Sequence, residues 1–336
     1  MIPPLAPTFD AALRDVRAQQ ARFRAAAAER LSDPPADQRD EAVQGLLALA
    51  EDPDGAVRAT AFESLGILEA QQGASLLREA FEDEHAAARQ AAVLALGRVA
   101  PEQGIDAIAG LIDDPRPEMR FSAVWTLSTL GASHANAIAA ALQDEDPEVR
   151  LLAAQCLGDL GASDQADAIA RLLDDDSDEV RFGAGAALAA LDDSRGAPTL
   201  RAALSRVDRA FPAAIGLGDL EDQQSRIELM RLAKHRWRSP IVRAAAARAL
   251  VRLGEPEGTE VIRKLVRSWR IEARQYAVEL VGELGLTSLV PDLARAFRRS
   301  RKAERPVYET TLEQLAPDSP EAKALLASIR ASDHPR

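Results

Sequence analysis

Basic and aromatic side chains gather in the last third of this 336-residue chain. Residues 201–310 contain 22 Lys and Arg against 14 Asp and Glu, whereas residues 1–200 contain 16 against 35. Cations that alternate with aromatic rings bind phosphates and stack against nucleic-acid bases, and they suit an acidic protein surface equally well. The net charge of −12 repels a polyanion at long range, so nucleic acid is the less favoured partner. The predicted anion-binding residues are Trp237, Arg238, Arg243, Trp269, Arg270, Arg274 and Arg305.

A second chemical pattern is an aspartate that stands six residues before an arginine. It recurs as Asp52–Arg58, Asp83–Arg89, Asp114–Arg120, Asp144–Arg150 and Asp175–Arg181. Carboxylates and guanidinium groups form charge-assisted hydrogen bonds, and we expect these bonds to join the turn of one repeat to the arginine of its neighbour rather than to hold a ligand. The aspartate is missing before the later arginines, where the same position holds Leu204, Trp237, Ser268 and Arg299. We therefore expect Arg243, Arg274 and Arg305 to be available to anions.

No group of residues has the spacing of a catalytic or metal site. The single cysteine, Cys156, excludes an internal disulfide and a cysteine-based zinc site, and its spacing places it in the core. The four histidines are dispersed, and acidic turns such as residues 174–179 lack the glycine and terminal glutamate of a calcium loop. Glycine-rich phosphate loops and nucleophile turns are absent from the sequence. We expect no cofactor, no metal and no enzymatic activity.

The arginines of the second pattern mark a repeated element. They fall at Arg58, Arg89, Arg120, Arg150, Arg181, Ala210, Arg243, Arg274 and Arg305, so the period is near 31 residues and one unit is degenerate. Each unit contains two amphipathic helical segments, and Asp54, Asp146, Ser177 and Ser239 stand where they can cap the second. A helix pair of this size cannot bury its apolar face alone and must stack on its neighbours. The sequence therefore predicts an all-α, right-handed α-solenoid of about nine two-helix repeats with helical caps.

Charge and repeat quality divide the predicted array into five parts. They are an N-terminal cap helix (1–36), an acidic subarray of five repeats (37–191), a degenerate repeat or kink (192–220), a basic subarray of three repeats (221–315), and a C-terminal cap and tail (316–336).

Apolar residues recur on the second helices at positions that should face solvent. The positions one and five after the arginine point about 165° away from the core stripe, at 100° per residue. They nevertheless hold Leu94, Phe121, Trp125, Leu151 and Phe182 in four consecutive units. Exposed aromatic patches mark partner surfaces, and the alternative is that repeat curvature buries these side chains between helices.

The repeat resembles the HEAT-like repeats first described in phycobilisome lyases. The resemblance rests on an Asp, a Pro or polar cap, Val-Arg, then Ala and Leu-Gly, and it covers about residues 37–315. It implies the α-solenoid fold. The family includes chromophore-lyase subunits, DNA glycosylases, binding scaffolds and deoxyhypusine hydroxylase, which holds two irons with His-Glu dipeptides. Because no histidine here precedes a glutamate, the hydroxylase activity is excluded.

These observations favour a non-enzymatic scaffold that binds a protein with basic and apolar features in the groove of the second helices. Two alternatives remain open: a nucleic-acid or polyanion binder that resembles the glycosylases and uses the basic repeats, and a chromophore-lyase-type subunit. No apolar stretch approaches the roughly 18 residues that span a bilayer, and residues 1–7 lack the pattern of a secretion signal. We expect a cytoplasmic protein without membrane insertion or a small-molecule substrate.

Overall fold

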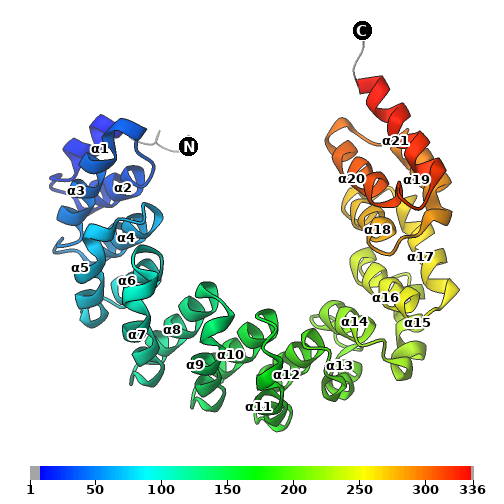
Figure 1. Ribbon diagram of the computed structural model, residues 1–336, viewed down its shortest axis with the longest axis horizontal. Coiled ribbons are helices and arrows are strands. Elements are labelled where there is room, and N and C mark those ends of the chain that lie inside the picture. The colour runs from blue at the N-terminus through cyan, green and yellow to red at the C-terminus, as the bar shows by residue number, and fades with distance from the viewer. Residues whose placement is uncertain (1–7, 334–336) are drawn as a thin grey trace. The chain divides into compact units, whose positions relative to one another are not determined.

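The chain folds into stacked helix pairs. The computed structural model describes residues 8–333 and contains no strand in that range. Its packing divides the chain into two compact units, which meet in the sequence between Leu172 and Leu173. This division lies before the degenerate repeat at which the charge changes sign. Figure 1 shows helix pairs following one another within each unit, so the predicted all-α solenoid of helix pairs is confirmed, while its right-handed sense and the number nine stay predictions.

The N-terminal unit consists of two layers of helices. Helices α2, α4, α6, α8 and α10 pack successively against one another, and α3, α5, α7 and α9 lie on their outer side (Figure 1). Its helices are α1 (Phe9–Asp15), α2 (Ala21–Leu31), α3 (Arg39–Leu49), α4 (Gly55–Ile67), α5 (Ala74–Glu79), α6 (Ala86–Val99), α7 (Pro101–Gly110), α8 (Pro117–Leu130), α9 (Ala135–Ala140), α10 (Pro147–Asp159) and α11 (Ala166–Arg171).

The C-terminal unit repeats this arrangement. Helices α12, α14, α16, α18 and α20 pack in succession, and α21 closes the stack by burying Ala322 and Leu326 against it. Its helices are α12 (Asp178–Ala190), α13 (Ala197–Ala203), α14 (Ala210–Asp219), α15 (Arg226–Lys234), α16 (Pro240–Arg252), α17 (Pro256–Val266), α18 (Ile271–Glu283), α19 (Val290–Phe297), α20 (Arg305–Leu315) and α21 (Pro320–Asp333).

The expected N-terminal cap helix is a pair of helices. Helix α1 ends at Asp15 and α2 begins at Ala21, so residues 9–31 form a helix pair of their own. Phe9 is buried, whereas Phe23 is exposed beneath the guanidinium of Arg22. The cap therefore covers α4 through α2, in the same way as one second helix covers the next.

Local signals explain where the second helices begin and end. Asp54, Asp146 and Ser177 accept hydrogen bonds from amides of the first helical turn, as predicted, but Ser239 makes no such bond. Eleven residues after the repeat position, the backbone adopts a positive φ in seven repeats and so ends the helix, whereas Ala100 and Ala316 keep a negative φ. Glycine occupies this position in several repeats, for example Gly161 at 67°, whereas Glu69, Asp192 and Glu221 occupy it elsewhere.

Candidate binding surfaces

The Asp and Arg pattern forms a ladder of ion pairs within the N-terminal unit. Arg58 donates to both carboxylate oxygens of Asp83 in the next repeat, at 2.7 Å from Nε and 2.6 Å from Nη2. Arg120 binds Asp144 in the same way, at 2.7 Å and 2.8 Å, and the side chains of both pairs are at most 12 % exposed. Each arginine also donates to the carbonyl of its own turn, six residues earlier. The predicted structural role of these pairs is confirmed, since each guanidinium joins two turns.

Electrostatics in the ladder follows from this geometry. The Arg58 guanidinium holds the pKa of the Asp83 carboxyl below its usual value, although burial acts in the opposite direction. Asp83 Oδ1 also accepts the amide of His85 at 2.8 Å, and the other ladder aspartates bond the amide two residues on in the same way. The arginine of the preceding repeat and an amide of its own turn therefore both favour the ionised form of the Asp83 carboxylate.

Two rungs differ from the sequence prediction. Arg89 pairs with Glu118 at 2.6 Å instead of Asp114, because Asp114 is bound by Arg116 in its own turn. Arg24, which has no aspartate six residues before it, binds Asp52 at 2.8 Å and donates to the carbonyl of Ala18. The sequence analysis did not predict the Arg24–Asp52 pair. It could have done so, because the arginine binds the backbone carbonyl six residues earlier and does not need an aspartate side chain there.

Part of the predicted apolar surface is exposed on the second helices of the N-terminal unit. On α8, Phe121 is 39 % exposed and Trp125 is 49 % exposed, while Met119 and Leu127 of the same helix are fully buried. Leu94 on α6 is 38 % exposed, and Leu151 on α10 is half-buried. The alternative that curvature seals the α8 rings between helices is therefore wrong. We call Leu94, Phe121, Trp125 and Leu151 the apolar strip.

One exposed apolar residue near this register was missed. Ile67 at the end of α4 is 56 % exposed and stands nine residues after Arg58, one helical turn beyond the positions that the sequence analysis considered.

Phe182 lies in the C-terminal unit, and its ring is covered by an arginine. The Arg209 guanidinium carbon lies 4.9 Å from the centroid of the ring, which is half-buried. Phe182, Arg206 and Arg209 help to line a cavity of about 370 Å³. Phe182 therefore contributes less free apolar surface than the sequence suggested.

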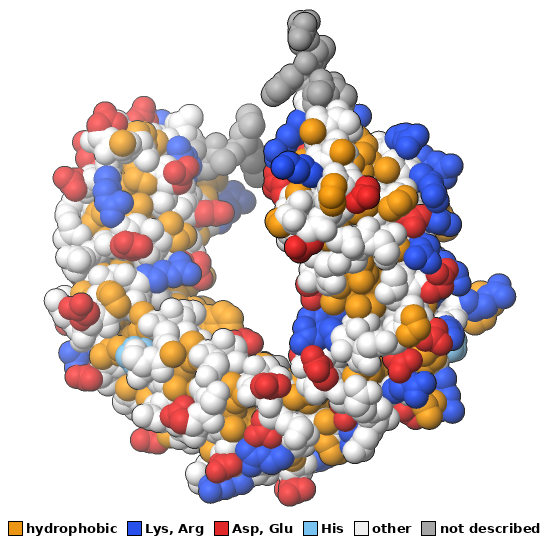
Figure 2. All heavy atoms as spheres, turned by 45° about the vertical axis from the view of Figure 1, so that its right-hand side comes forward, with side chains coloured by type: hydrophobic (Ala, Val, Ile, Leu, Met, Phe, Trp, Pro, Cys, Tyr) orange, Lys and Arg blue, Asp and Glu red, His pale blue; other side chains and the backbone are white. Residues whose placement is uncertain are grey.

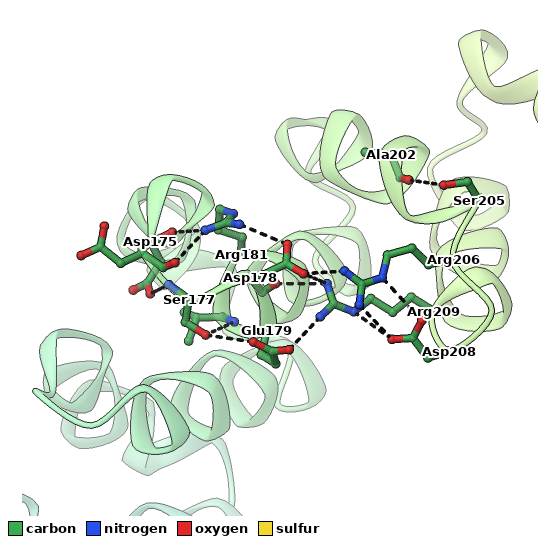
Figure 3. Close-up of polar contacts among 12 residues, drawn as sticks. Asp175, Ser177, Asp178, Glu179, Arg181, Ala202, Ser205, Arg206, Asp208 and Arg209 are labelled. Carbon is green, nitrogen blue, oxygen red and sulfur yellow. Dashed lines mark hydrogen bonds and ion pairs between the residues drawn. The ribbon is translucent and has the colours of Figure 1, made fainter.

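The degenerate repeat keeps an ion-pair network despite lacking the ladder arginine. Figure 3 shows Arg181, Arg206 and Arg209 converging on the carboxylate of Asp178, at 3.1, 2.7 and 2.9 Å. Arg209 also binds Glu179 at 3.2 Å. Arg209 stands one residue before Ala210, the position that matches the repeat arginines. The sequence analysis compared only that position and therefore did not identify Arg209.

The strongest concentration of unpaired cations lies between two inter-helix turns of the C-terminal unit. A cleft of about 370 Å³ is lined by both exposed tryptophans and by Arg236, Arg238, Arg243, Lys264 and Arg270. Trp237 is 82 % exposed and Trp269 is 84 % exposed. Among residues 8–333, no carboxylate forms an ion pair with any of these five cations; Arg238 and Arg243 donate only to the carbonyls of Ser205 and Ala233. We call this site the Trp–Arg cleft.

Stacking holds two of the cleft arginines against the indoles. The guanidinium carbon of Arg236 lies 4.9 Å from the ring centroid of Trp237, and that of Arg270 lies 5.4 Å from the ring of Trp269. Each indole is thus covered on one face by its own neighbour and projects into solvent with the rest of its surface.

Two predicted anion-binding residues do not belong to the cleft. Arg274 pairs with the buried carboxylate of Glu304, at 3.1 Å from its Nε, and donates to the carbonyl of Ser268. The prediction that Arg274 is available to anions is wrong. Its partner Glu304 stands one residue before Arg305, whereas the repeat pattern places the acid six residues before that arginine. Arg305 is half-buried against the ring of Phe297 at 5.4 Å and does not line the cleft.

Within residues 8–333 there is no group of three or more His, Cys, Asp and Glu side chains that could hold a metal ion. Cys156 is buried as predicted, and burial raises the pKa of its thiol. No helix in the described part of the chain has the length and apolarity that crossing a membrane requires.

Comparisons with known proteins identify the repeats. Residues 74–138 and 135–211 match the family model of HEAT repeats, and residues 242–268 match that of the PBS lyase HEAT-like repeat. A search of curated proteins gave no significant match.

Solved structures of low sequence identity share the fold. The complex of CpcE and CpcF of phycocyanin lyase from Nostoc sp. PCC7120 aligns with a TM-score of 0.51 and 22 % identity, over 67 % of this chain and 94 % of that chain. The protein YibA of Escherichia coli aligns with a TM-score of 0.57 and 18 % identity, over 72 % of this chain and 92 % of that chain. These identities support a common fold and nothing about activity.

Proposed function

This chain is a HEAT-repeat α-solenoid, and we propose that its N-terminal unit is a non-enzymatic scaffold that binds a protein partner through the apolar strip. The observation that carries the proposal is the exposure of Phe121 and Trp125 on a helix whose opposite face is completely buried. Other residues of α8 already supply the buried face of the helix, so folding alone does not require aromatic side chains at these two positions.

The energetics favour a docking role for these rings. Covering the exposed part of a tryptophan removes roughly 100 Å² of apolar surface from water, which contributes about 2.5 kcal/mol. Tryptophan and other aromatic residues supply most of the affinity where they sit in the centre of an interface. The apolar strip therefore has enough surface for a specific contact.

Charge defines the chemistry of the partner. Residues 1–172 contain 14 Lys and Arg and 28 Asp and Glu. Glu63 on α4 and Asp159 on α10 are exposed, five and nine residues after their repeat arginines, the same register positions as the strip and Ile67. We therefore propose a partner segment that presents apolar side chains flanked by Lys or Arg, because opposite charges accelerate and orient the encounter.

The test compares the wild-type protein with the double variant Phe121→Ala/Trp125→Ala. Partners are captured from the native host, identified, purified and titrated against both proteins by calorimetry. The expected result is an affinity loss of about 100-fold or more, with helicity and melting temperature unchanged. The matched control is Ile227→Ala, which removes an exposed apolar side chain from the C-terminal unit and should bind as the wild type does.

Equal affinity of the double variant and the wild type for every purified partner overturns the proposal. Unfolding of the double variant also overturns it, because the two rings would then be required by the stack itself.

A further inference from the structure

We propose that the Trp–Arg cleft and the turns beside it bind single-stranded nucleic acid. The one juxtaposition that carries this inference is a pair of almost fully exposed indoles among five cations that no described carboxylate neutralises. The inference is independent of the protein-binding surface proposed for the N-terminal unit, because it uses other residues.

The cations continue beyond the cleft as a row. Successive inter-helix turns of the C-terminal unit carry Arg236 and Arg238, then Arg270, then Arg298 and Arg299. None of these five forms an ion pair within residues 8–333. On the right-hand side of Figure 2, Lys and Arg side chains gather along the outer edge of this unit. Neighbouring packed helices lie about 8–10 Å apart, so the row presents positive charge at regular intervals, which suits an extended polyanion better than a single small anion.

The two indoles select the kind of polyanion. Every nucleic-acid base has a π-face that can stack on an aromatic side chain, and this contact does not depend on sequence. The arginine stacked on each indole leaves the opposite face available and adds cationic character to the platform. In a duplex the bases are stacked on each other, so the indoles would gain nothing from it. A carboxylate-rich peptide would use the cations but leaves the two exposed rings without a role.

The negative charge of the whole chain does not prevent this contact. Screening reduces interactions between exposed charges beyond about 8 Å at physiological ionic strength, so the local field of the cleft decides the binding. Residues 201–310 carry the excess of 22 cations over 14 acids, while the 35 acids of residues 1–200 belong mainly to the other unit.

The experiment is a fluorescence-anisotropy titration of the full chain with labelled 20-nucleotide oligothymidine and with a hairpin duplex of equal charge. We expect saturable binding to the single strand at 50 mM salt, at least tenfold tighter than binding to the duplex. The affinity should fall with salt with a logarithmic slope of about −3 to −4, as expected when about five phosphates are neutralised.

Two variants separate stacking from charge. Trp237→Ala/Trp269→Ala should weaken binding about 100-fold, roughly tenfold for each indole, and leave the salt slope unchanged. Lys264→Gln/Arg270→Gln should reduce the slope by about 1.4. Both pairs are exposed, so circular dichroism and melting temperature should match the wild type. Phe23→Ala, which removes an exposed ring that is also stacked under an arginine but lies in the N-terminal unit, is the matched control and should bind the single strand normally.

Three results overturn the inference. The first is no binding to the oligonucleotide at 50 mM salt. The second is binding that the tryptophan variant retains, or that the duplex or polyglutamate matches, because the cleft is then a general polyanion surface. The third is binding to vesicles containing 30 % phosphatidylserine without binding to the oligonucleotide, because the indoles then serve as anchors at a membrane surface.

Discussion

The inter-helix turns of the two units have the same backbone plan but opposite surface chemistry. In three turns of the N-terminal unit an aspartate at the start of the turn binds an arginine of the preceding repeat, as Asp83 binds Arg58 and Asp144 binds Arg120. In two later turns of the C-terminal unit the same position holds Trp237 and Ser268, and Arg243 reaches only a backbone carbonyl. One residue per repeat thus decides whether a turn is internally neutralised or left cationic.

The C-terminal unit replaces the missing aspartates with other ion pairs. Arg267 binds the buried Asp292 at 2.5 Å, and Arg274 binds Glu304. Arg248 joins Asp219 at 2.8 Å to Glu283 at 2.6 Å. Ion pairs at other positions can therefore join neighbouring repeats in place of the ladder. Turns without a ladder aspartate can then serve a different function.

Removing a ladder arginine should produce the largest difference between the units. Arg120→Ala leaves the buried Asp144 carboxylate without its partner, and we expect a loss of about 3 kcal/mol in the free energy of unfolding. Arg243→Ala removes one hydrogen bond to a carbonyl and should cost about 1 kcal/mol. Urea unfolding followed by circular dichroism measures both, and equal losses would contradict the contrast between the two kinds of turn.

Installing the missing aspartate should convert a cationic turn into a neutral one. The Ser268 hydroxyl already accepts the amide of Arg270 at 3.2 Å, as the ladder carboxylates do two residues on. Ser268→Asp places a carboxylate where Arg243 of the preceding repeat can bind it, and we expect a stabilisation of about 1–2 kcal/mol. Oligothymidine binding should weaken about fivefold.

The isosteric variant Ser268→Asn is the control for this change. It should keep the hydrogen bond from the Arg270 amide without adding charge. Stability and oligonucleotide affinity should therefore equal those of the wild type within experimental error. A similar gain in both variants would show that the ion pair is not its source.

Low pH should weaken the Arg58–Asp83 ion pair of the ladder. The folded pKa of Asp83 is depressed by Arg58, so its stabilising contribution is present above the unfolded value of about 3.9 and is lost as pH falls through the folded pKa. We expect amide exchange near Asp83 and Arg58 to accelerate below about pH 4. In Asp83→Asn this acceleration should be absent over the same range, because the titrating group is gone; an unchanged profile would assign the effect to other carboxylates.

The smallest effect concerns a feature that both units share. Glu69 and Glu221 adopt positive φ angles of 47° and 49° where other repeats have glycine. Glu69→Gly and Glu221→Gly should each stabilise the protein by about 0.5–1 kcal/mol, because glycine avoids the steric cost of the left-handed region. Gly254→Ala, at the equivalent position with φ of 78°, should destabilise by a similar amount, and melting curves of the three variants measure the comparison.

The features that recur at a fixed distance from the repeat arginine could be predicted from the sequence. The helix pairs, the ladder and the exposure of Trp125 all follow from counting residues from the arginine, because each repeat places equivalent positions on equivalent faces. Trp237 and Trp269 were singled out for a different reason, because they lie among the basic residues of the inter-helix turns.

The contacts that escaped prediction depend on shifts within the period. Glu304 binds Arg274 although it stands one residue before the next arginine, and Arg209 is displaced by one residue from the expected position. Arg24 belongs to the N-terminal pair of helices, where Ala18 stands six residues before the arginine and no aspartate marks the register. Long side chains can bridge such shifts, so the identity of a partner depends on reach in space and not on sequence spacing alone.

The ladder also has a direction. In Arg24–Asp52, Arg58–Asp83 and Arg120–Asp144, the cation belongs to the earlier repeat and the anion to the later one. We therefore expect each of these ion pairs to form during synthesis as soon as the later turn has emerged, because the arginine that it binds lies on the segment made before it.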